Sequence, residues 1–209
     1  MAPNSSMFGL QFDSVPVFPL GAFVLPDGLL PLRIFEPRYV QMLEECVANG
    51  TGFVVATLES GTEIDPSATT RGRGCMVEVD SVEETEPKVY KILVQGRFRV
   101  DVSEIWRQSD GLQRGKVELI AEPEQSLPTL PEHEILVSLL NEILNQVRGP
   151  MPYKTRRTND ARWVAYRLIE LLPIESDERE RLSSMDNAHK ILDDIQKGLD
   201  RWVTIRRAD

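Results

Sequence analysis

The stretch Ser14-Val-Pro-Val-Phe-Pro-Leu20, with the residues that follow it as far as Tyr39, decides the fold of this chain. It is rich in β-branched and aromatic side chains, and it contains five prolines, at positions 16, 19, 26, 31 and 37. Each proline removes an N–H donor and clashes with the preceding helical turn, so the stretch cannot be helical. A central strand is equally disfavoured, because proline is confined to strand edges, first positions and bulges. We therefore expect short, bent strands with inward apolar side chains, as the first wall of a small β-barrel.

The composition is that of a globular protein. The chain has 209 residues, 41% of them hydrophobic and 27% charged, which is enough to bury a sizeable core. No apolar run approaches the about 18 to 20 residues that cross a bilayer, and residues 1–6 lack the basic and apolar pattern of a secretory signal. Cys46 and Cys75 lie in apolar contexts and are expected to be buried free thiols, as in a reducing compartment. These features predict a cytoplasmic protein.

Negative charge is concentrated in the first part of the chain. Residues 1–122 carry 11 basic and 18 acidic side chains, a net charge of −7, whereas residues 123–209 carry 13 and 15, a net charge of −2. Binding to nucleic acid requires clustered Lys and Arg side chains, so nucleic acid is an unlikely partner by default. The acidic residues Glu83, Glu84 and Glu86 are interpreted as a solvated hairpin turn.

Residues 1–122 are predicted to form the barrel with one helix. The helix is expected near 37–49, because Pro37 suits a first turn, apolar residues form one stripe, and Asn49-Gly50 is a stop signal. Residues 1–13 are interpreted as a frayed lead-in and residues 60–73 as a surface loop. The remaining segments alternate polar and apolar residues, which is typical of an antiparallel sheet or barrel. The expected strands are 52–58, 75–82, 89–94, 98–102, 105–106 and 112–121.

Residues 132–209 are predicted to form a helical bundle, after a proline-containing linker at 123–131. The linker ends in Thr129-Leu-Pro-Glu132, the pattern of a capping box. Beyond it the apolar period is helical, with breaks at Gly149-Pro-Met-Pro152 and at Pro173. The expected helices are about 132–147, 160–172, 176–185 and 186–202. The fold class predicted for the whole chain is therefore α+β, a barrel of bent antiparallel strands followed by a helical bundle.

Several enzyme motifs are approached, and each lacks a residue that its chemistry requires. Gly111-Leu-Gln-Arg-Gly-Lys116 is one residue short of a phosphate-binding loop and is followed by Val117 instead of a hydroxyl residue. His133-Glu134 could begin a zinc-protease helix, but Val137 stands where the second histidine belongs. No Gly-x-Ser-x-Gly elbow is present. We expect no catalytic residue, no cofactor and no metal, unless a pocket gathers several carboxylates or hydroxyls.

The basic segment Tyr153-Lys154-Thr-Arg156-Arg157 offers an alternative function. Interleaved aromatic and basic residues can bind RNA, with Lys154, Arg156 and Arg157 as phosphate contacts. The competing interpretation is a solvated loop between helices, with Arg162 and Arg167 on a polar helix face. The acidic balance of the rest of the chain favours the loop.

Four motifs in this order resemble a known family. They are Val15–Leu20, Leu29–Tyr39, Gly96-Arg-Phe-Arg99, and Asp160–Ile174 with its Leu-Leu-Pro-Ile ending. Together they resemble the N-terminal substrate-binding domain of Lon (La-type) ATP-dependent proteases, which also occurs in bacterial stand-alone proteins and in cereblon-type adaptors. The resemblance implies a PUA-like β-barrel followed by a helical bundle. It also implies a non-catalytic chain, since neither the ATPase module nor the serine–lysine protease domain is present in these 209 residues.

A polypeptide-binding role in protein quality control is the function that this resemblance implies. The expected partners are unfolded or tagged polypeptides, and a protease or chaperone that receives them. Apolar side chains near the barrel rim are the candidate contacts, because an extended segment could add to an edge or fill a groove there. The candidates are Phe23, Leu25, Pro26 and Leu29 around the Asp27-Gly28 turn, with Met151, Pro152 and Tyr153 from the helical part. The alternative that Phe23 and Leu25 belong to the core stays open.

Overall fold

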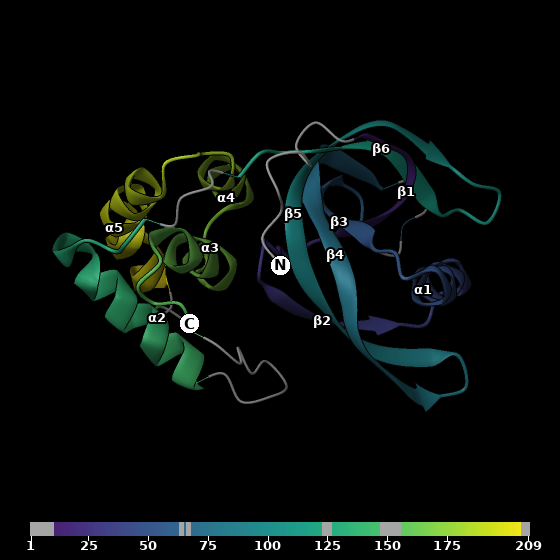
Figure 1. Ribbon diagram of the computed structural model, residues 1–209, viewed down its shortest axis with the longest axis horizontal. Coiled ribbons are helices and arrows are strands. Elements are labelled where there is room, and N and C mark those ends of the chain that lie inside the picture. Colours follow the sequence, from purple (N-terminus) through teal and green to yellow (C-terminus); the bar gives the residue numbers. More distant parts are fainter. Residues whose placement is uncertain (1–10, 63–64, 66–67, 123–126, 147–155, 206–209) are drawn as a thin grey trace. The chain divides into compact units, whose positions relative to one another are not determined.

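The computed structural model describes the chain except for residues 1–10, 63–64, 66–67, 123–126, 147–155 and 206–209 (Figure 1). It divides into two compact units, Met1–Glu122 and Pro123–Asp209, here called the barrel unit and the helical unit. No described helix is long and apolar enough to cross a membrane. Each unit is described separately below.

The barrel unit is built on one sheet that closes on itself. The strand order is β2-β5-β4-β3-β1-β6, and an additional pairing of β5 with β6 joins β1, β3, β4, β5 and β6 into a ring. Within the described part of the chain, β2 pairs with β5 alone and lies outside the ring. This mixed sheet with its helices confirms the α+β class, while the PUA-like label stays a prediction. The elements are β1 (Gln11–Leu20), β2 (Leu29–Ile34), α1 (Pro37–Asn49), β3 (Phe53–Ser60), β4 (Thr69–Glu86), β5 (Val89–Arg107) and β6 (Gln113–Leu119).

β4 and β5 form one long hairpin, where the sequence predicted a series of shorter strands (Figure 1). β4 already begins at Thr69, so residues 69–73 of the predicted loop over 60–73 belong to a strand. The first half of β5 pairs with β2 and its second half pairs with β6, so a single strand serves both the ring and its extension. A break was expected at Gln95-Gly96, but β5 continues through these residues. The register of its pairing with β4 shifts there, between Met76 and Val77. Such a bulge bends a strand without ending it, and it interrupts the polar–apolar alternation in the same way as a loop.

β1 is a central strand, which the prolines were expected to forbid. It pairs with β3 in parallel from Val17 to Leu20 and with β6 in antiparallel fashion from Gln11 to Val17. Among the residues that the structure describes, Pro16 therefore pairs with β6 alone, and Pro19 pairs with β3 alone. Each proline sits on a local edge, so the rule on proline applies to each half of the strand separately. Pro31 follows the same rule, because β5 is the one ladder partner of β2 in the described ranges of the chain.

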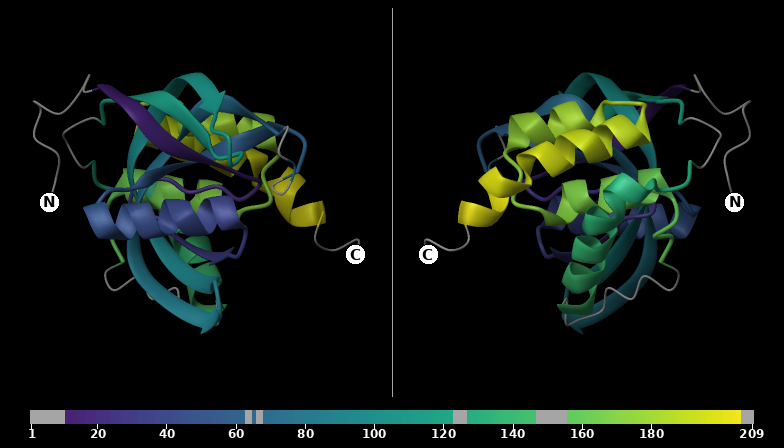
Figure 2. Two further views of the ribbon diagram at one scale, coloured as in Figure 1. Left: turned by 90° about the vertical axis from the view of Figure 1, so that its right-hand side faces the viewer. Right: turned by 90° about the vertical axis from the view of Figure 1, so that its left-hand side faces the viewer.

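Two apolar clusters cover opposite faces of the inner strands. Phe53 and Val55 of β3 belong to the larger cluster, whereas Val54 and Ala56 belong to the smaller one. The expectation that this strand is covered on both faces is therefore confirmed. α1 closes the larger cluster, to which it contributes Tyr39, Val40, Met42, Leu43 and Cys46; the left view of Figure 2 shows this helix at the front of the barrel unit.

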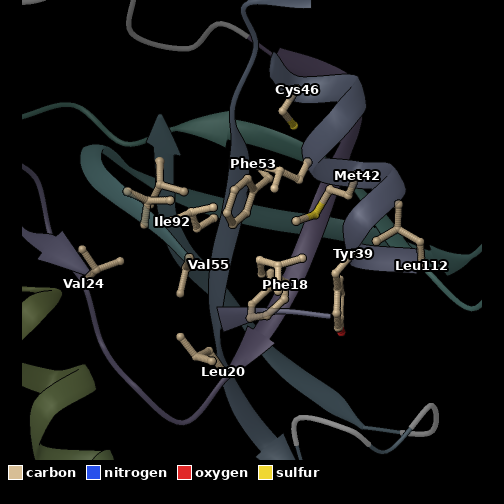
Figure 3. Packing of buried hydrophobic residues seen from close by; sticks show 14 of the residues in the cluster. Phe18, Leu20, Val24, Tyr39, Met42, Cys46, Phe53, Val55, Ile92 and Leu112 are labelled. Atoms are coloured by element: carbon tan, nitrogen blue, oxygen red, sulfur yellow. The ribbon is translucent and has the colours of Figure 1, made fainter. Parts of the chain in front are cut away.

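The aromatic centre of the larger cluster ties α1 to the barrel (Figure 3). The ring of Phe18 lies 4.2 Å from the ring of Tyr39 and 6.1 Å from that of Phe53, centroid to centroid. Such tilted pairs stabilise a core by about 0.5–1.5 kcal/mol beyond the burial of their area. The helix itself has the expected limits, with Pro37 in its first turn and Gly50 in the left-handed conformation at its end.

The Glu36-Pro-Arg-Tyr39 part of the deciding stretch also has a buried role. Arg38 is 8% exposed, forms an ion pair with Glu36 at 2.8 Å and lies over the ring of Tyr39. Its Nη1 also donates to the carbonyl oxygen of Gly111, at 3.4 Å. The motif thus joins the start of α1 to the loop between β5 and β6.

The helical unit contains η2 (Pro131–His133), α2 (Glu134–Gln146), α3 (Ala161–Leu171), α4 (Ser176–Ser183) and α5 (Ala188–Ile205). α3 is the centre of this unit and packs against α2, α4 and α5. Figure 2 shows α5 extended beside it. The side chain of Asp160 caps α3 by accepting from the backbone N–H groups of Arg162 and Trp163. The predicted limits of this helix are confirmed.

Two expectations for the helical unit are wrong. Thr129 does not cap a helix, because its hydroxyl donates to the carbonyl oxygen of Thr158, and Leu130 is the N-cap of η2 without a side-chain hydrogen bond. Arg167 was expected on a polar helix face but is fully buried. Its guanidinium donates to both carboxylate oxygens of Glu170, at 2.6 and 2.8 Å, and this bidentate partner compensates its charge.

Residues 127–129 of the expected linker belong to the helical unit. Pro128 pairs with Asp160 in an isolated bridge, and the N–H of Ala161 donates to the carbonyl oxygen of Leu127 at 2.8 Å.

A buried histidine follows this segment in the sequence. His133 is fully buried and its Nε2 lies 2.8 Å from Oδ1 of Asp193 on α5. These contacts attach the start of the unit to its core helices.

Candidate functional site

The first candidate surface is the segment Phe23–Leu29, here called the apolar turn. Three backbone hydrogen bonds of 2.8 Å hold it: Asp27 N–H to Gly96 O, Gly96 N–H to Gly28 O, and Gly28 N–H to Leu25 O. Asp27 adopts the left-handed conformation, with φ of 64°. The turn is therefore fixed on the middle of β5 in a single conformation.

Gly96 allows this close approach. A Cβ atom at this position would lie 2.1 Å from the carbonyl oxygen of Leu25 and 3.1 Å from Sγ of Cys75. No side chain fits between β5 and the turn, which explains the glycine of the Gly96-Arg-Phe-Arg99 motif.

The four candidate residues of the apolar turn have two different environments. Leu25 is 3% exposed and lies in the core beside the equally buried Val24, so for Leu25 the structure agrees with the core alternative. Phe23, Pro26 and Leu29 are half-buried. They form an apolar rim that the core supports from below.

The helical unit contributes less to the description of a site. Met151, Pro152, Tyr153 and Lys154 lie outside the described residues. Arg156 donates to Oδ1 of Asn145 at 2.8 Å and to the carbonyl oxygen of Leu144 at 3.4 Å. Its guanidinium is thereby directed toward α2, while Arg157 is exposed.

A second candidate surface was not predicted. A cavity of about 630 Å³ lies between the first half of β1, the end of α1 and β4, and we call it the β1–α1 groove. Its first residues, Gln11–Asp13, belong to the segment 1–13 that was interpreted as a frayed lead-in, but these three residues lie in β1. Its lining residues are Gln11, Phe12, Asp13, Ser14, Val15, Pro16, Glu45, Asn49, Thr51, Gly52, Met76, Glu78 and Arg114.

Catalysis in the β1–α1 groove is disfavoured by how its carboxylates are held. Glu45 forms an ion pair with Arg114 at 2.6 Å, and Glu78 forms one with Arg97 at 3.0 Å. Both carboxylates are about half exposed, with 42% and 55% of their side chains accessible. Paired, solvated carboxylates are charged acceptors rather than the opposed acid and base that hydrolysis requires. Within the described residues, no three His, Cys, Asp or Glu side chains are grouped to hold a metal ion.

The cysteines are not placed as nucleophiles either. Cys46 and Cys75 are each 1% exposed and belong to the larger apolar cluster. Burial raises the pKa of the Cys46 thiol, which keeps it in its unreactive protonated form.

Comparison with known proteins establishes the family. Residues 14–198 match the family described as the ATP-dependent protease La (LON) substrate-binding domain. Because the match extends over most of the chain, the chain belongs to this family, and the resemblance seen in the sequence is confirmed.

Similar curated proteins are much longer than this chain. It is 33% identical over 122 residues to cereblon of Danio rerio, which covers 56% of this chain and 27% of cereblon. It is 26% identical over 138 residues to Lon protease of Azorhizobium caulinodans, which covers 65% of this chain and 16% of that protease. The chain thus matches about a quarter or less of the length of these relatives.

Solved structures show the same fold. A Lon N-terminal domain protein from Xanthomonas campestris matches with a TM-score of 0.69 and 27% identity, over 89% of this chain and 98% of that one. The N-terminal domain of the Mycobacterium avium complex Lon protease matches with a TM-score of 0.57 and 14% identity, over 92% and 98%. The second similarity concerns the fold alone.

Proposed function

We propose that the protein is a non-catalytic adaptor that binds extended or unfolded polypeptide. The observation that carries this proposal is the apolar turn, in which Phe23, Pro26 and Leu29 are half-buried while backbone hydrogen bonds to Gly96 hold the segment rigid. A rigid apolar rim binds without a large ordering cost, since its conformation is fixed before the ligand arrives. Membership of a substrate-binding family supports a binding role for this surface.

The affinity expected from the apolar turn is modest. Full burial of a Phe or Leu side chain contributes about 1.5–3 kcal/mol, and most of the surface of these side chains is already covered, so at most about a third of that remains to be gained. The sum for two such side chains corresponds to weak, reversible binding once association costs are subtracted. Reversible binding suits an adaptor, and we propose that the protein passes its bound polypeptide to a protease or chaperone. The buried thiols of Cys46 and Cys75 favour a reducing, cytoplasmic setting.

Binding of a permanently unfolded protein tests the proposal. Fluorescein-labelled, reduced and carboxymethylated α-lactalbumin is titrated with the full chain, and anisotropy reports the complex. Phe23→Ser removes at most about 0.5–1 kcal/mol of apolar burial and should weaken binding about 2- to 5-fold. Ile135→Ser is the matched control, because Ile135 is 60% exposed on α2 of the helical unit. Absence of binding by the native chain would overturn the proposal, as would equal effects of the two variants.

The RNA alternative is tested in the same format. A labelled single-stranded RNA replaces the unfolded protein, and the triple variant Lys154→Ala, Arg156→Ala, Arg157→Ala provides the comparison. The net charge of −9 and the contacts of Arg156 within the helical unit favour no binding at physiological salt. Tight, salt-sensitive binding that this variant abolishes would replace the polypeptide proposal with the RNA one.

A further inference from the structure

We propose that the β1–α1 groove is a strand-addition site for an extended polypeptide segment that carries both apolar and Lys or Arg side chains. The bound segment continues the line of β3 and pairs with the free edge of β1. This inference rests on the proposed function in one respect, namely that the ligand is polypeptide. It concerns a different surface, because the groove follows the first half of β1 and the apolar turn comes after the end of that strand.

The groove lies where β3 is missing from the sheet. The β1–β3 ladder begins at Val17 opposite Val54, so among the described residues Gln11–Pro16 pair with β6 alone. β3 begins at Phe53, opposite Val77, and the continuation of β4 from Glu78 pairs with β5 alone among the same residues. Two strand edges therefore flank the position that a longer β3 would occupy. The lining of the groove includes residues of both edges.

The width of this position suits one additional strand. Neighbouring strands are about 4.8 Å apart, so two strands that flank a third are separated by about 10 Å. Where the third strand is absent, backbone donors and acceptors on the flanking edges are available to an incoming strand.

The inner end of the groove is held rigidly. A Cβ atom on Gly52 would lie 2.0 Å from the carbonyl oxygen of Val77, so the backbone before β3 is pressed against β4. The N–H of Thr51 donates to the carbonyl oxygen of Cys46 at 3.0 Å, and the Cys46 thiol donates to that of Gly52 at 3.5 Å. The end of α1 thus fixes the point at which an added strand stops, and the site exists before the ligand binds.

The edge of β1 is shaped by a bulge. β1 has one extra residue between Phe12 and Val15, relative to Val117 and Gly115 of β6. The carbonyl oxygen of Ser14 in this bulge accepts from Nη1 of Arg114 at 3.2 Å. Since Pro16 supplies no N–H, an added strand takes its hydrogen bonds from the residues before it.

The side chains of the groove define the chemistry of the segment. Its apolar contacts are Phe12, which is 41% exposed, with Val15 and Met76 beside it. Alternating side chains of an added strand point to opposite faces, so one set can meet this apolar surface while the other meets the charged rim.

The charged rim favours cations. Asp13, Glu45 and Glu78 line the groove. Each carboxylate has about four acceptor positions, and a single arginine cannot occupy all of them. The barrel unit as a whole has a net charge of −7, from 11 basic and 18 acidic side chains in residues 1–122. This field attracts Lys and Arg side chains and repels an acidic segment.

Three labelled peptides test the proposal on the full chain. The first is fluorescein-labelled (Val-Lys)4, the second is (Val-Glu)4, and the third is (Val-Lys)4 with N-methyl groups on alternate residues, which remove the hydrogen-bond donors of one edge. Anisotropy should show binding of the first peptide and at least tenfold weaker binding of the other two. Binding of the lysine peptide should also weaken as salt is raised from 50 to 500 mM. Equal affinity for the methylated peptide would overturn strand addition.

Matched charge reversals locate the site. The double variant Asp13→Lys, Glu78→Lys should weaken binding of the lysine peptide at least tenfold and improve that of the glutamate peptide. The control is Glu83→Lys, Glu86→Lys, which makes the same change of charge on exposed residues of β4 outside the groove. Equal losses in the two variants would show a diffuse electrostatic effect and overturn the assignment to the groove.

The outcomes separate this inference from the proposed function. Binding of unfolded α-lactalbumin without any preference among the three peptides refutes the groove site and leaves the proposed function intact. Methylation-sensitive peptide binding without binding of the unfolded protein supports the groove site and refutes the adaptor role. Ile135→Ser should leave peptide binding unchanged, and a loss in that variant equal to the loss in Asp13→Lys, Glu78→Lys would contradict a site at the groove.

Discussion

Replacement of Gly96 by alanine should destabilise the barrel unit and release the apolar turn. The added Cβ atom would lie 2.1 Å from the carbonyl oxygen of Leu25, a distance that forces β5 and the turn apart. Overpacking of this kind costs about 1–3 kcal/mol. Separation also weakens two backbone hydrogen bonds, Asp27 N–H to Gly96 O and Gly96 N–H to Gly28 O, each with a net contribution of about 1 kcal/mol. We expect a total loss of about 2–4 kcal/mol, since relaxation recovers part of both contributions.

The assay has to report on the barrel unit alone. The chain has two compact units, so one melting curve does not yield one free energy of unfolding. Amide hydrogen exchange measured by NMR resolves the units: exchange at Val54 and Val55 of β3 reports the opening of the barrel, and exchange at Asp27 reports the turn. Gly96→Ala should accelerate all three amides and leave the helical unit unchanged.

A second glycine supplies the control for this substitution. Gly50 has no neighbouring atom within 4 Å of an added Cβ, but its φ of 61° is left-handed. Gly50→Ala therefore introduces backbone strain of about 1–2 kcal/mol without a collision. The reasoning would be refuted if Gly96→Ala changed barrel stability by less than about 0.5 kcal/mol, the usual range for a neutral surface substitution, or if Asp27 kept its protection.

Three further predictions concern the rest of the molecule. Arg167→Ala should destabilise the helical unit by about 3–5 kcal/mol, because Glu170 is left buried without its partner, and the double variant Arg167→Met, Glu170→Met should recover most of the loss in urea unfolding. The hydrogen bond from Arg181 lowers the pKa of Glu178 below its ordinary value of 4.5, so the stabilisation is present above that pH and is lost as the pH falls through the lowered value; Glu178→Gln should melt earlier than the native chain at pH 6, and the difference should shrink as the pH falls below 4.5. Cys46 should react with Ellman's reagent at pH 8 only after unfolding in guanidinium, since it is 1% exposed and burial raises the pKa of its thiol; immediate reaction of the native chain would contradict the buried position.

Local chemistry was sufficient to predict some elements of the fold. The limits of helix α1 could be predicted, because Pro37 affects only the first turn of the helix and Gly50 only its last turn. The double burial of β3 was visible in its continuous apolar run, which needs cover on both faces. The cap of α3 followed from Asp160, whose side chain reaches N–H groups only two and three residues away.

Features that depend on pairing between distant residues could not be predicted in this way. The prolines of β1 were expected to exclude a central strand, but the two ladders of this strand change sides at Val17, and nothing in the local sequence records the change. The burial of Arg167 depends in the same way on the helices packed around α3. Glu170 is visible as a partner three residues away, but whether the pair is exposed is decided by tertiary packing.

The β1–α1 groove was missed for a related reason. Its residues come from four separated segments, and their meeting depends on where the β1–β3 ladder begins. Gln11-Phe-Asp-Ser14 does show a polar–apolar alternation, but the extra residue of the bulge interrupts it before Val15. If the sequence analysis had allowed for a bulge, the alternation would have placed the start of β1 before Val15. The groove would still not have been predicted, because its position depends on the register of the β1–β3 ladder.

Both candidate surfaces arise where two backbones approach too closely for a side chain. At Gly96 the apolar turn is pressed against β5, and at Gly52 the segment before β3 is pressed against β4. Close backbone contact fixes main-chain atoms rather than side chains, so each surface keeps its shape while its rim residues vary. Rim residues such as Phe23 and Asp13 can then change with the polypeptide that is bound, at little cost to the fold. Substitutions at Gly96 and Gly52 should therefore impair stability and binding together, whereas Phe23→Ser and Asp13→Lys should impair binding alone.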